Sequence, residues 1–143
     1  MTAAFETYRG KVDPSEIDHM GHMNIKYYAE KFDQATWKIL MAIGVTPRYV
    51  QETGKGFAVL ESLTKYLHEL LAGTSVLIET VLLEVTSKKV RILHRLKKME
   101  TGEIVATNEL LGIHFDLKLR KSCEMPNFIF ETALSYKITN QKL

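Results

Sequence analysis

The sequence predicts an α+β domain in which an antiparallel sheet of about five strands packs on one long helix. Three observations lead to this prediction. One stretch of about four to five turns has apolar residues at helical spacing. After residue 56 the apolar period changes to that of strands, and these strands follow one another through short turns. No linker or internal repeat divides the chain, so we expect a single domain over residues 1–143.

A first strand is expected over residues 4–12, and the long helix follows a loop. Charged residues such as Glu30 and Lys31 lie mostly off the apolar side of the helix. Asn24 is expected to cap its first turn and Gly44 to end it. A helix with so apolar a side must be buried against a sheet. The apolar residues at helical spacing are Tyr28, Phe32, Ala35, Ile39 and Ile43.

Residues 46–56 are interpreted as a short helix or an irregular link. Strands are then expected within residues 57–70, 75–87, 89–99 and 103–117, with a hairpin turn at Gly102. The third of these strands alternates Val90, Ile92 and Leu96 with Arg91, Arg95 and Lys97. The stretch VLIETVLLEV is apolar on both faces, which favours an oligomer in which a second copy covers part of the sheet.

Composition excludes several classes of protein. The net charge is +2 and the basic residues are scattered, which does not indicate nucleic-acid binding. The cluster Lys88, Lys89 and Arg91 is interpreted as a solvated turn. A single cysteine, Cys123, excludes an intrachain disulfide and fits a reducing compartment. The N-terminal residues lack the apolar segment of a secretory signal, and no apolar run reaches ~18 residues, so we expect a cytoplasmic protein without a membrane span.

The stretch EIDHMGHMNIKYY, residues 16–28, holds the candidate chemistry. His19 and His22 are three residues apart beside Asp18, a spacing that metal ligands can have. However, Gly21 lies between them, and the other histidines fall in separate strands without ligand-like spacing. We therefore expect no metal site. Those other histidines are His68, His94 and His114.

The same stretch can be read as a catalytic loop. A loop before a helix can place the carboxylate of Asp18 near free backbone N–H groups, and such groups can bind a developing oxyanion. Gly21 allows the tight turn that this requires. Alternatively, Asp18 and Asn24 only cap the helix, and His19 and His22 are surface residues. Residue types alone leave both interpretations open and favour capping.

The pattern Asp18, Gly21, His22, Met23, Asn24, Tyr27 and Tyr28 before a long helix resembles the 4-hydroxybenzoyl-CoA thioesterase-like branch of the hotdog-fold acyl-CoA thioesterases. The segments VLESLTKYLHELLAGTSV and TGEIVATNELLGIHFDL are similar to a sub-branch that occurs alone or fused behind carnitine dehydrogenases. The resemblance extends over residues 5–122. It implies a hotdog fold, in which the antiparallel sheet wraps around the central helix.

The resemblance also implies a set of roles. Asp18 would be the nucleophile or general base, and backbone N–H groups at Asn24 and Ile25 would form the oxyanion hole. Gly21 would make the tight turn, while His22 and Asn24 would shape the site. The protein would hydrolyse a small or medium acyl-CoA thioester without a cofactor. It would form a homodimer or homotetramer with sites at the subunit interface, where basic side chains meet the phosphates of coenzyme A.

Glu61 has the same strand parity as the apolar Val59 and Leu63. Either a bulge or an edge position turns it outward, or it lines the acyl pocket. If the likeness to the carnitine-linked sub-branch holds, the acyl group could be betainyl, whose cation favours carboxylates and aromatic faces. The candidates are Glu61, Tyr27, Tyr66 and Trp37, although Trp37 is better interpreted as helix core, and Tyr66 and His68 as a strand pair.

Two other functions remain open. Hotdog folds also include non-catalytic modules that bind acyl-CoA, and dehydratases that use a catalytic histidine. The acid in the loop favours a thioesterase over a dehydratase. A further branch carries its catalytic glutamate on the helix, but Glu30 is interpreted as facing solvent.

Overall fold

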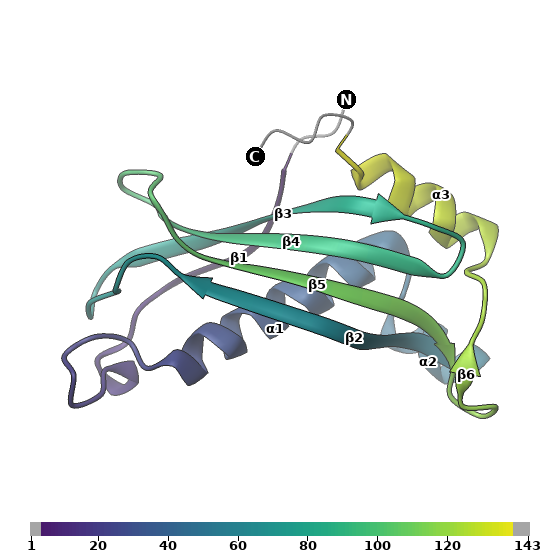
Figure 1. Ribbon diagram of the computed structural model, residues 1–143, viewed down its shortest axis with the longest axis horizontal. Helices are drawn as coiled ribbons and strands as arrows, with labels where there is room; N and C mark the ends of the chain where they lie inside the picture. The colour runs from purple at the N-terminus through teal and green to yellow at the C-terminus, as the bar shows by residue number, and fades with distance from the viewer. Residues whose placement is uncertain (1–3, 139–143) are drawn as a thin grey trace.

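A curled antiparallel sheet lies over one long helix in the computed structural model, which describes residues 4–138 (Figure 1). The helical segments are η1 (Pro14–Glu16), α1 (Ile25–Ile43), α2 (Pro47–Thr53) and α3 (Asn127–Tyr136). The strands are β1 (Phe5–Lys11), β2 (Lys55–Tyr66), β3 (Ser75–Val85), β4 (Lys89–Lys98), β5 (Ile104–Asp116) and β6 (Lys121–Ser122).

The strand order is β1-β3-β4-β5-β2, with the short β6 paired to the end of β5. All pairs of neighbouring strands are antiparallel. The predicted turn between β4 and β5 is present, and Gly102 has a φ of 77° there. β2 is therefore an edge strand of 12 residues, with only β5 beside it among residues 4–138.

The caps predicted for the long helix are confirmed. The Lys26 N–H donates to Asn24 Oδ1 at 3.0 Å, and Gly44 ends α1 with a φ of 113°. Two details were predicted wrongly. Lys31 is only 2% exposed, and Trp37, interpreted as helix core, is 52% exposed. Both follow from the helical period, which places residue 31 beside the buried side of α1 and residue 37 away from it.

The C-terminal part of the described chain covers the far end of the sheet, and the sequence did not predict it. Buried residues of α3 join the core around the end of α1. After α3, the Ile138 N–H donates to Leu82 O at 3.0 Å. Ile138 packs on Val81 and Leu93, which point away from α1. Part of the two-sided burial of β3 is thus provided by this chain itself.

A buried chain of hydrogen bonds links the sheet to α1 through His94, which has no exposed surface. His94 Nε2 lies 2.8 Å from Thr36 Oγ1, whose hydroxyl donates to Phe32 O. Nε2 must therefore carry the proton. Nδ1 then accepts from the Thr80 hydroxyl at 2.7 Å, and Thr7 lies 2.8 Å from Thr80. Because burial disfavours the charged form of His94, the ring is neutral and Nδ1 is its acceptor atom.

We predict that His94 makes stability depend on pH. Burial lowers the pKa of His94 from 6.5 to about 3, so below pH 6.5 the unfolded chain binds a proton that the folded chain does not. The contribution of His94 to stability is fully present above pH 6.5 and is lost as the pH falls toward 3. Between pH 7 and 5 the loss is about 2 kcal/mol, at about 1.36 kcal/mol per pH unit. Urea unfolding at both pH values measures it.

Two controls isolate this effect. His94→Gln should flatten the pH dependence by the same amount, since glutamine does not titrate. The NMR signals of the His94 ring in the wild type should stay constant down to about pH 4. A ring that titrates near pH 6.5 in the folded protein contradicts the prediction.

The arrangement is a hotdog fold, as the sequence indicated. The sheet curls around α1, and the start of α1 lies at the end of the sheet where β2 finishes (Figure 1). Within residues 4–138, no helix is long and apolar enough to cross a bilayer.

Candidate active site

The chain turns tightly between Asp18 and His22, just before α1. The Gly21 N–H donates to Asp18 O at 3.0 Å, and the Asp18 N–H donates to His22 O at 3.2 Å. Gly21 has a φ of 87°, in the left-handed region that favours glycine. Space does not require the glycine, since nothing lies within 4 Å of the position that a Cβ would occupy. The backbone conformation is what selects it.

The carboxylate of Asp18 is held by two donors. The Met20 N–H donates to Oδ1 at 2.8 Å, and Asn24 Nδ2 donates to Oδ2 at 2.7 Å. The Asn24 amide, followed by the Met20 N–H, holds the pKa of Asp18 below its usual range. Asp18 is therefore ionised at neutral pH. It does not cap α1 itself, because that position belongs to Asn24.

The first turn of α1 offers one free backbone donor. The Asn24 N–H donates to Glu16 O at 2.9 Å, and the Lys26 N–H is taken by the Asn24 side chain. The N–H of Ile25 has no acceptor among residues 4–138. Of the two donors that the resemblance implied, Asn24 and Ile25, only Ile25 is open to a ligand.

A buried ion pair fixes this loop to the helix. Lys31 Nζ lies 2.9 Å from Glu16 Oε2, and the two side chains are 3% and 12% exposed. Glu16 Oε1 also accepts from the Asp13 N–H, and Glu16 O holds the Asn24 N–H. Glu16 thus connects η1, the cap of α1 and the middle of α1, which positions Asn24 and, through it, Asp18.

A cavity of about 210 Å³ opens at the start of α1, and we call it the helix-start cavity. It contains His22, Ile25 and Tyr66 from the predicted site. Tyr66 meets the buried Tyr28 edge-on, with ring centroids 5.0 Å apart. His22 Nδ1 lies 3.2 Å from Glu69 Oε2. The lining residues are His22, Met23, Ile25, Tyr28, Tyr66, Leu67, His68 and Glu69.

A second cavity of about 180 Å³ lies between α1 and strands β2 and β5, and we call it the Asp33 cavity. Asn108 on its wall is only 3% exposed. None of its polar residues could be predicted from the sequence, because the strand register that brings β2 and β5 together is not visible in either segment alone. The lining residues are Ala29, Phe32, Asp33, Thr36, Val59, Ser62, Thr64, Asn108 and Leu110.

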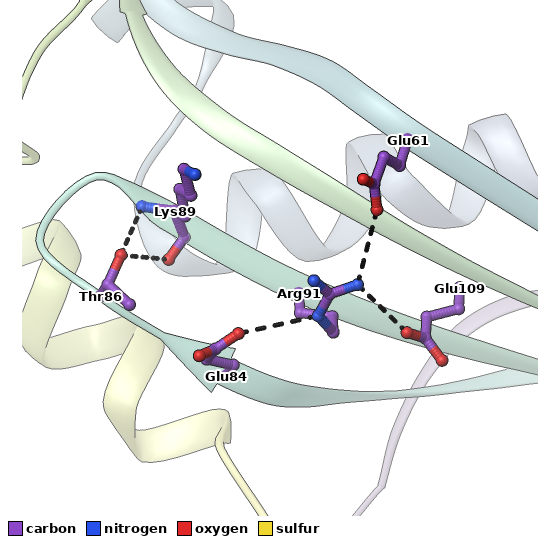
Figure 2. Close-up of polar contacts among 6 residues, drawn as sticks. All are labelled: Glu61, Glu84, Thr86, Lys89, Arg91 and Glu109. Atoms are coloured by element: carbon purple, nitrogen blue, oxygen red, sulfur yellow. Dashed lines mark hydrogen bonds and ion pairs between the residues drawn. The ribbon is translucent and has the colours of Figure 1, made fainter.

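Glu61 lies away from both cavities. The register shifts between Val59 and Glu61, so the glutamate turns outward, as one of the two interpretations expected. Figure 2 shows Glu61, Glu84 and Glu109 around Arg91 on the side of the sheet away from α1. Arg91 Nη1 is 3.9 Å from Glu61 and 3.2 Å from Glu109.

Other predicted residues also lie apart from the cavities. Arg91 was interpreted as part of a turn, but it lies within β4. The turn itself joins β3 to β4 just before Lys89, whose N–H donates to Thr86 Oγ1 (Figure 2). Tyr27 is partly buried against the core, with Lys26 Nζ 5.0 Å from its ring centroid. It lines neither cavity.

The histidines of the motif form no cluster of metal ligands. His19 is exposed and His22 faces Glu69, while His68 pairs with Glu103 at 3.3 Å. Among residues 4–138, no group of three or more His, Cys, Asp or Glu side chains is placed to hold a metal ion.

Residues 12–132 match the Thioesterase-like superfamily. The chain is 31% identical over 119 residues to an L-carnitine dehydrogenase/betainyl-CoA thioesterase of Agrobacterium fabrum, covering 83% of this chain and 24% of that one. It is 29% identical over 117 residues to a betainyl-CoA thioesterase of Pseudomonas aeruginosa, covering 82% and 74%. The chain thus spans about a quarter of the first relative. A Staphylococcus aureus protein solved with CoA superposes with a TM-score of 0.90 at 20% identity, covering 100% and 91%.

Proposed function

Because the chain belongs to the Thioesterase-like superfamily, we propose that it hydrolyses an acyl-CoA thioester to the free acid and coenzyme A. The observation that carries this proposal is the turn before α1. It presents an ionised carboxylate, Asp18, beside a helix start whose Ile25 N–H has no acceptor within residues 4–138. A nucleophile or base and an oxyanion donor are what attack on a thioester carbonyl requires.

The lowered pKa of Asp18 supports a nucleophilic role. A general base works best with a pKa near the working pH, whereas the Asn24 amide keeps Asp18 well below it. In the proposed reaction an Asp18 oxygen bonds to the thioester carbon, and the C–S bond breaks to release the coenzyme A thiolate, which takes a proton from water. Water then hydrolyses the mixed anhydride and restores the carboxylate. The alternative is that Asp18 takes a proton from the attacking water.

The start of α1 would stabilise the charge that develops on the thioester oxygen. The Ile25 N–H supplies one hydrogen bond, and the positive end of the helix dipole favours the oxyanion. His22, whose ring faces Glu69, lies on the wall of the adjoining helix-start cavity. We propose that this cavity holds the thioester group.

The acyl group is proposed to be small or medium, and the names of the relatives point to trimethylammonium acids such as betaine. Release of free thiol from a panel of short, aromatic, long and trimethylammonium acyl-CoAs tests the function. Turnover of at least one class is expected. Binding of coenzyme A without turnover of any class would instead identify a non-catalytic acyl-CoA-binding module.

We propose that two copies join through β2 to form a homodimer, which can pair again into a homotetramer. The support is the long edge of β2, which pairs with no strand other than β5 among residues 4–138, and its exposed apolar residues, since such an edge favours pairing with another strand. Val59, Leu60 and Leu63 are 55%, 53% and 59% exposed. Sedimentation at micromolar concentration distinguishes a monomer from these assemblies.

We predict that Ile25→Pro removes the oxyanion donor without unfolding the helix. Proline lacks an N–H, and the first helical position is where it is best tolerated. Asn24 already has the extended backbone, φ −68° and ψ 145°, that precedes proline. We expect kcat to fall by about 10²–10³-fold, as for loss of one oxyanion donor.

Ile25→Ala is the matched control, because it shortens the same side chain but keeps the N–H. It should retain a kcat close to that of the wild type. Circular dichroism should show the same helix content in both variants. An Ile25→Pro enzyme with normal helix content and normal kcat rules out this donor.

A further inference from the structure

The Asp33 cavity lies beyond the helix-start cavity along α1 and β2, which both cavities share. On α1, Ile25 lines the first cavity, whereas Ala29 and Asp33, four and eight residues later, line the second. Residues four apart share one face of a helix. On β2, Tyr66 lines the first cavity and Thr64 the second. Residues two apart share one face of a strand. The two cavities therefore follow one another between α1 and β2.

Helix geometry sets the distance between the reacting carbonyl and Asp33. At about 1.5 Å per residue, Ala29 lies about 6 Å and Asp33 about 12 Å along the axis from Ile25. The side chain of Asp33 leans toward the helix N-terminus, which leaves its carboxylate about 10 Å away. The nitrogen of betaine is only two bonds, about 2.5 Å, from the carbonyl carbon. Its cation therefore stops well short of Asp33.

Charge in the Asp33 cavity has one sign. Asp33 is the only ionisable side chain among its lining residues, and no lysine, arginine or histidine lines it. Asp33 is exposed and makes no hydrogen bond or ion pair with any residue from 4 to 138, so its carboxylate is available to a ligand. Such a cavity attracts a cation and repels an acyl group that ends in a carboxylate.

Asn108 places a buried amide on the wall of the Asp33 cavity. Its Nδ2 donates to Ser62 Oγ at 3.0 Å and to Thr64 Oγ1 at 2.9 Å, and its buried Oδ1 has no partner in the described chain. Exchanging the positions of Oδ1 and Nδ2 does not remove the unpaired atom. The Ser62 and Thr64 hydroxyls can donate to Oδ1 instead, but the NH₂ group is then left without a partner. One end of Asn108 thus lacks a partner among residues 4–138 in either orientation, so the wall of this cavity includes an unpaired buried amide atom.

From these observations we infer that the acyl group carries a cationic end about four to six bonds from the thioester carbonyl, longer than betainyl, and that Asp33 recognises this cation. The chain length follows from about 6 Å of extended chain plus an ionic contact of about 4 Å. This inference rests on the proposed thioesterase function for the position of the carbonyl. It assigns Asp33 as a specificity-determining residue.

A series of acyl-CoAs tests the inference. The series has ω-trimethylammonio acyl groups of two, four and six carbons, each paired with the neutral isostere in which carbon replaces nitrogen. The ratio of kcat/KM for the cation over its isostere should be largest at four or six carbons. Asp33→Asn should lower that ratio by about twofold to fivefold, the range for loss of one exposed ion pair, and should leave the two-carbon ratio unchanged.

Glu30→Gln is the matched control, since Glu30 is an exposed carboxylate on α1 outside both cavities, and it should leave all ratios unchanged. The Kd values of stable ketone analogues, with CH₂ between sulfur and carbonyl, separate the two proposals. Selective binding that depends on Asp33, without hydrolysis, supports this inference and contradicts the thioesterase function. A ratio that peaks at two carbons, or one that Asp33→Asn does not change, overturns the inference.

Discussion

Asp18→Asn is expected to lower kcat for thioester hydrolysis by about 10³-fold or more, within the range for loss of an acid–base or nucleophilic group. Asparagine keeps the shape of the side chain, and its Oδ1 can still accept from the Met20 N–H. However, an amide neither attacks the thioester carbon nor takes a proton from water. Free-thiol release under saturating substrate measures the loss, and KM should change little.

Asp116→Asn is the matched control for this variant. Asp116 is also a turn aspartate whose carboxylate accepts backbone N–H groups, from Lys118 and Leu119, and those bonds lower its pKa as well. It lies at the end of β5, outside both cavities. Normal turnover by Asp116→Asn together with loss in Asp18→Asn assigns the effect to the site. Normal turnover by Asp18→Asn contradicts the proposed mechanism.

The role of Asp18 can be decided by two further measurements. If Asp18 is the nucleophile, rapid quenching during a single turnover should leave a protein whose mass is increased by the acyl group, and Asp18→Asn should not. A general base leaves no such adduct. Because the pKa of Asp18 lies below its usual 3.8, the acid limb of kcat/KM due to this residue should fall below pH 3.8.

The long helix could be predicted from sequence because its signals are local. Asn24 and Gly44 cap it through their own backbone conformations and through residues a few positions away. Lys31 was misplaced because its charge was weighed above its spacing. It lies three residues after Tyr28 and four before Ala35, both buried, and only the distant Glu16 makes its burial possible.

The candidate site could be predicted only in part for the same physical reason. The turn from Asp18 to Asn24 is contained within seven residues, so its glycine and its cap are visible in the sequence. The face on which Glu61 lies could not be predicted, because a bulge reverses the face of every residue that follows it in a strand. The wall of the Asp33 cavity required the register of β2 against β5, which pairs Thr64 with Asn108.

Lys31→Met and Glu16→Gln are each expected to lower the free energy of unfolding by about 3–5 kcal/mol, because each leaves the other charge buried and unpaired. The loss should be larger for Glu16→Gln, since Lys31 is the more deeply buried partner at 3% exposed. The Tyr8 ring, 5.7 Å from Lys31 Nζ, compensates only part of that charge. Urea unfolding at pH 7 measures both variants.

The double variant Lys31→Met/Glu16→Gln is the control for the ion pair. It removes both charges, so it should be more stable than either single variant, with a coupling energy of about 2 kcal/mol or more. Glu16 O also accepts a hydrogen bond from the Asn24 N–H, and Asn24 positions Asp18. A variant that shifts the Glu16 backbone should therefore lower kcat even in the fully folded protein. Single variants that lose stability additively would show that the Lys31 and Glu16 side chains act separately.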